Sequence, residues 1–188
     1  MLTRLHRCNY ADATSPTQLR KQIYPSAITP TRLCRHNYTD KTTLAQLCQW
    51  KYTDADVDAI TFTTSKPVYL LGVQIFGSQD TSYSGILNIY ENKNRISGVS
   101  PFQVESQSID NYHGFNVNLD KAVRIIPDVV YTVEARIRGP PSYYSGYGNE
   151  IIRFGDDDII ITYEYSPTYT NGTTVHDGQI PTLIFRKL

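Results

Sequence analysis

The sequence predicts an all-β protein, an antiparallel β-sandwich that follows a short repetitive N-terminal arm. Aromatic residues make up 12% of the 188 residues, with 15 Tyr and 6 Phe against a single Met, a composition that suits pleated, half-buried surfaces. From residue 57 onward, apolar and polar residues alternate with period two between turn-forming residues. Since no stretch has a helical pattern, two antiparallel sheets packed face to face are the most economical architecture.

The individual strands follow from this alternation. Residues 115–119 and 129–137 each present one apolar and one polar face. Further strands are expected at 59–64, 68–76, 85–91, 123–126, 151–154, 159–165 and 182–186. Turn formers separate them at Gly77, 92–94, 127–128, 139–141, Gly155 and 171–172. The ending that contains Gly172 and Gly178 is interpreted as structural, because glycine tolerates the positive φ needed to steer the chain into the last strand.

The N-terminal arm is repetitive. Residues 1–56 divide into four consecutive units of 14 residues, each with a Leu at its fifth position and a Tyr at its tenth. Solenoid repeats usually have about 20 residues or more, so these units have too little apolar surface to stack into one. We expect only the fourth unit to join the fold. The predicted organisation is an arm over residues 1–46, poorly ordered or loosely docked, followed by a sandwich domain over residues 47–188.

Charge and hydropathy argue against several classes of partner. The chain has 18 basic and 18 acidic residues, so no general attraction to nucleic acid or to an anionic membrane is expected. No apolar run approaches the ~18 residues of a membrane span, and no signal peptide is recognisable. All three cysteines lie within the repeat region, residues 1–56, which suits a reducing compartment. We therefore expect a cytoplasmic protein.

No pattern predicts an enzyme, a metal or a cofactor. The sequence lacks the common nucleophile, phosphate-loop and metalloprotease motifs. The pairs His6 with Cys8 and Cys34 with His36 occupy equivalent repeat positions in swapped order, without the spacing typical of zinc ligands. The acidic run 156–158 lacks the alternate spacing of a calcium loop. His113 and His176 are interpreted as surface residues of loops, and neither catalysis nor metal binding is expected.

Three segments identify a family resemblance. They are DAITFTTSKPVYLLGVQIFGS (58–78), SGILNIYEN (84–92) and, most specifically, SPTYTNGTTVHDGQIPTLIF (166–185). Together with the W-K-Y at 50–52, these segments resemble the PHR domain, which is named for PAM, Highwire and related giant ubiquitin ligases and also ends BTB-containing adaptor proteins. The resemblance covers roughly residues 47–188. It implies a β-sandwich that binds protein partners, usually for a ubiquitin-ligase assembly.

The best candidate surface is the loop PPSYYSGYGNE, residues 140–150. Tyrosines among Gly, Ser and Pro offer large contact areas with few rotors to immobilise, as in recognition loops. A purely structural role, covering one end of the sandwich, remains an equal alternative. The candidate partner-binding residues are Tyr143, Tyr144, Tyr147 and Asn149 of this loop, Tyr83 from another expected loop, and Gln179 at the rim.

The function expected is a protein-interaction module that recognises a partner or substrate for a ubiquitin-ligase-type assembly. The alternative is a carbohydrate-binding β-sandwich, because tyrosines in loops also stack on sugars. A secretory leader would have favoured the sugar binder, and none is recognised.

Overall fold

The computed structural model describes residues 31–34, 49–50, 57–109, 112–143, 148–154, 158–166, 173–176 and 178–188. Every regular element in these ranges is a β-strand. The strands are β1 (Thr31–Cys34), β2 (Gln49–Trp50), β3 (Asp58–Thr64), β4 (Val68–Phe76), β5 (Ser82–Glu91), β6 (Asn94–Glu105), β7 (Gln107–Ile109), β8 (Tyr112–Ile125), β9 (Tyr131–Arg138), β10 (Ser142–Tyr143), β11 (Ile151–Phe154), β12 (Ile159–Glu164) and β13 (Thr182–Lys187).

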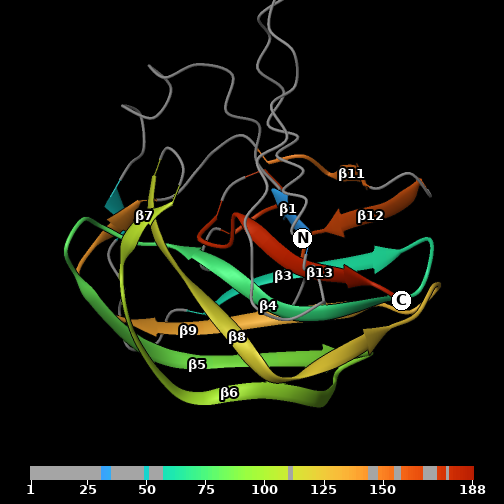
Figure 1. Cartoon of the computed structure of the whole chain (residues 1–188), viewed down its shortest axis with the longest axis horizontal. Helices are drawn as coiled ribbons and strands as arrows, with labels where there is room; N and C mark the ends of the chain where they lie inside the picture. Colours follow the sequence, from blue (N-terminus) through green and yellow to red (C-terminus); the bar gives the residue numbers. More distant parts are fainter. Residues whose placement is uncertain are drawn as a thin grey trace, which may run out of the picture.

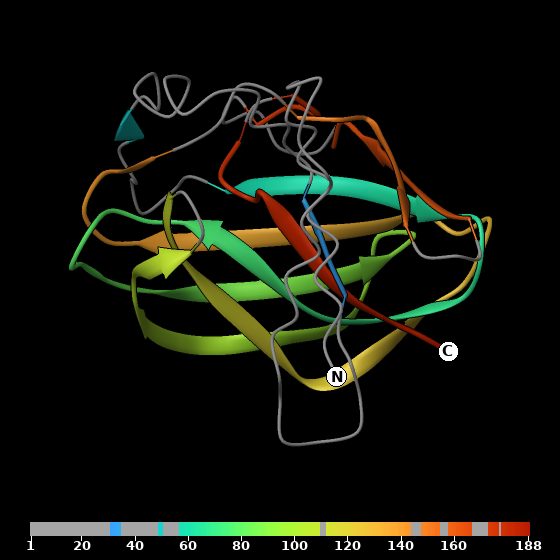
Figure 2. The same cartoon turned by 45° about the horizontal axis from the view of Figure 1, so that its top comes forward.

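The long strands form two sheets that pack face to face (Figures 1 and 2). One sheet has five strands in the order β1-β13-β4-β8-β7, and the other has six in the order β11-β12-β3-β9-β5-β6. A separate two-stranded ribbon joins β10 to β2. All the strand pairs described in these two sheets are antiparallel. The predicted all-β sandwich is therefore confirmed.

The core lies between the two sheets and is rich in aromatic rings. The ring of Phe62 on β3 is fully buried; its centroid lies 5.8 Å from that of Tyr131 and 5.7 Å from that of Phe185. These contacts join β3 and β9 of one sheet to β13 of the other. Offset and edge-on aromatic pairs stabilise by about 0.5–1.5 kcal/mol beyond the area that they bury.

The strand boundaries follow the predicted alternation where one face is apolar. Strands β4 and β11 begin and end at the predicted residues. The two strands expected at 115–119 and 123–126 are one continuous β8, whose pairing with β4 is interrupted between Leu70 and Gly72. Asp120, Lys121 and Ala122 lie exposed at this irregularity, so the break in the sequence pattern marks a bulge-like irregularity within one strand and not a boundary between two.

Strand β6 was not predicted, because its sequence lacks a regular apolar face. It lies at the edge of the six-stranded sheet, and Phe102 is its one buried apolar residue among twelve. The hairpin that joins it to β5 turns at Asn92 and Lys93, which have φ values of 46° and 78°. Two central residues with positive φ are typical of a type I′ hairpin turn, so the turn itself was predicted correctly.

Two of the repeat units contribute backbone to the sheets. Strand β2 comes from the fourth unit and pairs with β10, as expected for a unit that joins the fold. Strand β1 comes from the third unit and pairs with β13 at the edge of the five-stranded sheet. The third unit therefore also touches the body, and the domain boundary between residues 46 and 47 stays a prediction.

Candidate functional site

The candidate loop lies at the end of the sandwich where β4 and β9 finish and β5 begins. Ser84 pairs with Arg138 there, and the backbone N–H of Phe76 donates to the carbonyl oxygen of Gln179 at 3.0 Å. Three connections meet at this end, which we name the loop end: residues 77–81, the described parts of 139–150, and the described parts of 173–181.

Three hydrogen-bonded ties hold the segment that begins at Gly139. The Oγ of Ser78 donates to the carbonyl oxygen of Pro141 at 2.5 Å, and the Oγ of Ser142 donates to Oε1 of Gln179 at 2.7 Å. Farther along, the N–H of Gly148 donates to the carbonyl oxygen of His176 at 2.8 Å. The segment is thus fixed on both sides of Tyr143 to the neighbouring connections.

The third tie requires a glycine and includes a histidine side chain. A Cβ at Gly148 would lie 2.0 Å from the carbonyl oxygen of Val175, closer than any real contact. The Nδ1 of His176 lies 2.9 Å from the carbonyl oxygen of Gly148; because a carbonyl can only accept, this nitrogen carries the hydrogen. His176 is exposed, as the sequence predicted, and it also helps to fix the loop.

Tyr143 and Asn149 are the predicted contact residues that the structure describes on the loop itself. Both are half-buried, so each keeps part of its side chain at the surface. Tyr144 and Tyr147 lie outside the described residues. The loop role of Tyr143 and Asn149 stays a prediction at this point.

The prediction that Tyr83 lies in a loop is wrong. Tyr83 is the second residue of β5, has 1% of its surface exposed, and stacks on Phe115 with ring centroids 5.0 Å apart. Its hydroxyl accepts a hydrogen bond from the N–H of Ser78 at 2.9 Å. Because it is enclosed in the core, Tyr83 supports the loop end from beneath and offers no surface to a partner.

Gln179 also differs from its predicted place at the rim. Its side chain is fully buried, and its amide oxygen accepts from Ser142, which is equally buried. The residue therefore braces two connections inside the loop end. The hydrogen bonds from Ser142 to Gln179 and from Ser78 to Pro141 were not predicted from the sequence, because serines are common in loops and neither position has a pattern that indicates a structural role.

The ending before β13 is structural, as predicted. Gly178 has a φ of 150°, a conformation that is essentially restricted to glycine. Thr173, which is 3% exposed, donates from its hydroxyl to Oδ1 of the buried Asp58 at 2.5 Å. Gly172 lies outside the described residues.

The described residues contain neither a metal-binding cluster nor a membrane-spanning helix. No group of three or more His, Cys, Asp or Glu side chains within them is placed to hold a metal ion. No helix within them is long and apolar enough to cross a membrane. The side chains of the pairs His6 with Cys8 and Cys34 with His36, and those of Asp156 and Asp157, lie outside the described part of the structure.

Comparison with known proteins gives consistent matches. The profile of the PHR domain matches residues 38–186, which is most of the chain. BTB/POZ domain-containing protein 3 of Homo sapiens is 30% identical over 131 residues, covering 68% of this chain and 24% of that protein. BTB/POZ domain-containing protein 6 of Xenopus tropicalis is 29% identical over 129 residues, covering 68% of this chain and 24% of that protein.

The E3 ubiquitin-protein ligase highwire of Drosophila melanogaster is 28% identical over 140 residues, covering 69% of this chain and 3% of that protein. The chain thus spans about a quarter of the length of the BTB/POZ relatives named above and a small fraction of highwire.

Proposed function

The chain belongs to the PHR domain family, as the resemblance of its segments predicted, and we propose that it is a protein-interaction module of a ubiquitin-ligase-type assembly. The module binds its partner through the loop end and catalyses nothing itself. Its proposed location is the cytoplasm. The partner is a component or substrate of the assembly.

One observation carries the choice of the loop end. The described residues of the segment from Gly139 to Asn149 are tied to the rest of the molecule on both sides of the undescribed residues 144–147, and both Tyr143 and Asn149 keep exposed surface. A recognition loop that is fixed before binding loses less conformational freedom when it binds, which increases affinity. Tyr is also enriched among the residues that dominate binding energy.

The connection to ubiquitin ligation rests on the relatives. One relative is named as an E3 ubiquitin-protein ligase and others as BTB/POZ domain proteins. The match covers 24% of each of the two BTB/POZ relatives and 3% of highwire, so most of each relative lies outside it. A module that supplies recognition, with ligase chemistry provided by other subunits, fits this division.

The proposal is tested by affinity purification with the full chain as bait, followed by mass spectrometry. A double variant, Tyr143→Ala with Asn149→Ala, removes the two half-buried loop side chains that keep part of their surface exposed. A matched control, Ile126→Ala with Val130→Ala, removes two side chains that are 38% and 39% exposed at the turn before β9, at the opposite end of that strand.

The wild type and the control are expected to capture the same proteins, among them subunits of a ubiquitin-ligase assembly. The loop double variant is expected to lose them, while its circular dichroism melt stays unchanged. Equal capture by the loop double variant would contradict the proposal. Binding to a glycan array without capture of any protein would support a carbohydrate-binding function instead.

A further inference from the structure

The outer face of the six-stranded sheet carries a polar array that is independent of the loop end. Alternation along β9 buries Val133 and Ala135 in the core, so Glu134 and Arg136 point to the outer side. Across this face, Asn88 on β5 pairs with Glu134 on β9 and with Gly98 on β6.

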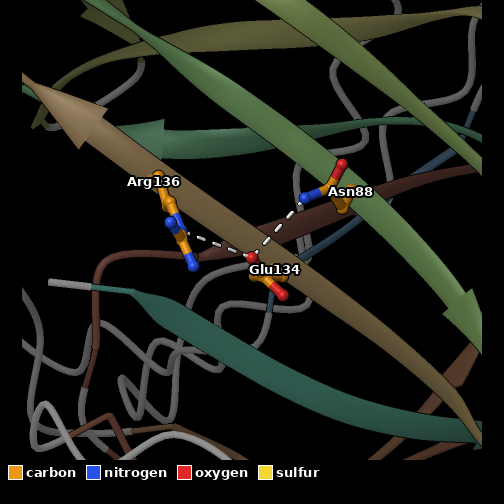
Figure 3. A network of polar contacts seen from close by, with 3 residues as sticks. All are labelled: Asn88, Glu134 and Arg136. Atoms are coloured by element: carbon orange, nitrogen blue, oxygen red, sulfur yellow. Dashed lines mark hydrogen bonds and ion pairs between the residues drawn. The ribbon is translucent and has the colours of Figure 1, made fainter. Parts of the chain in front are cut away.

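Glu134 is a buried carboxylate that anchors this array. It is 2% exposed, and its Oε1 lies 3.6 Å from Nε of Arg136 and 3.5 Å from Nδ2 of Asn88. Figure 3 shows Asn88 and Arg136 approaching Glu134 from its two sides. The side chain of Arg136 nevertheless remains 57% exposed. The carboxylate therefore orients the guanidinium, while more than half of the Arg136 side chain stays exposed.

A second guanidinium lies on the other side of Asn88. Arg95 on β6 is exposed, and a Cβ at Gly98 would lie 3.0 Å from one of its terminal nitrogens. The lack of a side chain at Gly98 thus leaves room for the guanidinium of Arg95 above the backbone of β6. The exposed surface here combines two arginines with an asparagine between them.

Tyr90 on β5 lies among these charges. Burial raises the pKa of Tyr90, and the negative charge of Glu134 and a hydrogen bond to it raise this pKa further, whereas the positive charges of Arg95 and Arg136 lower it. Both guanidinium groups therefore act on the hydroxyl of one half-buried tyrosine. Tyr and Arg are the residue types most enriched at binding hot spots.

The charge of this face contrasts with that of the domain. Residues 57–188 carry ten basic and fourteen acidic residues, so their net charge is negative. The array has two positive groups, Arg95 and Arg136, and one negative group, Glu134, so its net charge is positive. Guanidinium groups match the planar geometry of carboxylates and can donate two parallel hydrogen bonds to them. A positive patch on an acidic domain selects for a ligand of opposite charge.

We propose that this face is a second docking surface, which binds an acidic segment of a partner protein through Arg95 and Arg136. The segment lies across β9, β5 and β6, where Glu134 orients Arg136 and Asn88 supplies a neutral polar contact between the two arginines. This surface shares no residue with the loop end, and we expect the two sites to bind independently.

The test uses the full chain and a fluorescein-labelled peptide of twelve residues rich in Glu, with a peptide of the same length carrying Gln in place of Glu as control. Fluorescence polarisation measures the Kd at low and at high salt. The wild type is expected to bind the Glu peptide at least tenfold more tightly than the Gln peptide. High salt is expected to reduce this difference, because surface charges are screened.

Two variants locate the site. Arg95→Gln with Arg136→Gln is expected to weaken binding of the Glu peptide about tenfold or more, equivalent to about 1.4 kcal/mol. Arg95→Gln alone, which leaves the ion pair of Glu134 intact, is expected to give part of this loss. The matched control, Lys121→Gln with Arg124→Gln, removes two exposed cations of β8 on the other sheet and is expected to change the Kd less than twofold.

Equal losses in the arginine variant and the β8 control would overturn the proposal, since they would indicate a general charge effect. Absence of wild-type binding to the Glu peptide would overturn it as well, as would tighter binding to a single-stranded oligonucleotide than to the peptide. The loop variant Tyr143→Ala with Asn149→Ala is expected to bind the Glu peptide with the wild-type Kd. The experiment can therefore refute this proposal without refuting the proposed function of the loop end.

Discussion

Gly139 should not tolerate even one added methyl group. A Cβ at this position would lie 2.3 Å from Cδ1 and 2.7 Å from Cε1 of Tyr83, whereas carbon atoms in contact are normally about 3.5–4.0 Å apart. The ring would therefore have to move by about 1 Å or more. It has little room to do so, because it stacks on Phe115 and its hydroxyl is bound to the N–H of Ser78.

We expect Gly139→Ala to lower the free energy of unfolding by about 1–3 kcal/mol, the usual cost of overfilling a packed core. For a chain of this size the thermal midpoint should fall by about 2–4 °C for each kcal/mol. Gly139 is not among the glycines with positive φ, so alanine can adopt its backbone conformation and the cost is steric. Urea unfolding followed by circular dichroism measures it.

A double-mutant cycle identifies the source of this cost. In a Tyr83→Ala background the added Cβ meets no ring, so Gly139→Ala should cost less than about 0.5 kcal/mol there if the contact with the ring is the cause. An unchanged unfolding curve for Gly139→Ala alone would refute the placement of Tyr83 beneath the loop end. An equal cost in both backgrounds would refute the steric explanation.

Three further predictions concern single contacts, each measured by urea unfolding. Thr173→Val should lower stability by about 1.5–3 kcal/mol, because it removes a hydrogen bond to the buried carboxylate of Asp58, whereas Thr173→Ser, which keeps the hydroxyl, should cost clearly less; equal costs would contradict this role. Gly178→Val should cost about 1–3 kcal/mol, because a β-branched residue is strained at a φ of 150°, and an unchanged curve would show that the position is ordinary. Burial raises the pKa of Tyr131 above its ordinary value of 10.0; the N–H of Ile126 opposes this rise, and Glu91 adds to it. A raised folded pKa gives stability that is complete below pH 10.0 and is lost as the pH rises through the folded pKa. The stability difference between the wild type and Tyr131→Phe should therefore be constant near neutral pH and should shift against the wild type above pH 10.0, and a constant difference throughout would contradict the shift.

Much of the fold could be predicted because one face of most strands is apolar. Period-two alternation located the strands that border the core, such as β4 and β11. Strand β6 was not predicted because both of its faces lie largely at the surface, so its sequence shows no alternation of apolar and polar residues. Strand β8 was predicted as two strands for a related reason: the exposed residues at its irregularity interrupt the apolar face without ending the strand.

The errors at the candidate site have a physical origin as well. Ser82 and Ser84 suggested a loop around Tyr83, but in a strand two small polar residues on one face place the residue between them on the other. That signal was present and could have located Tyr83 in the core. The residues that neighbour Gln179 in the sequence do not indicate that it is buried, because the side chain that binds it, Ser142, is 37 residues away.

Photo-crosslinking at the loop end tests the central claim most directly. A benzophenone amino acid is placed at position 143 or 149, or at position 130 as the control, and each full-length protein is irradiated in a cell lysate. We predict that positions 143 and 149 become covalently joined to the same partner protein, and that position 130 does not. Crosslinks to this partner from position 130, with none from 143 or 149, would contradict the assignment of the loop end as the binding surface.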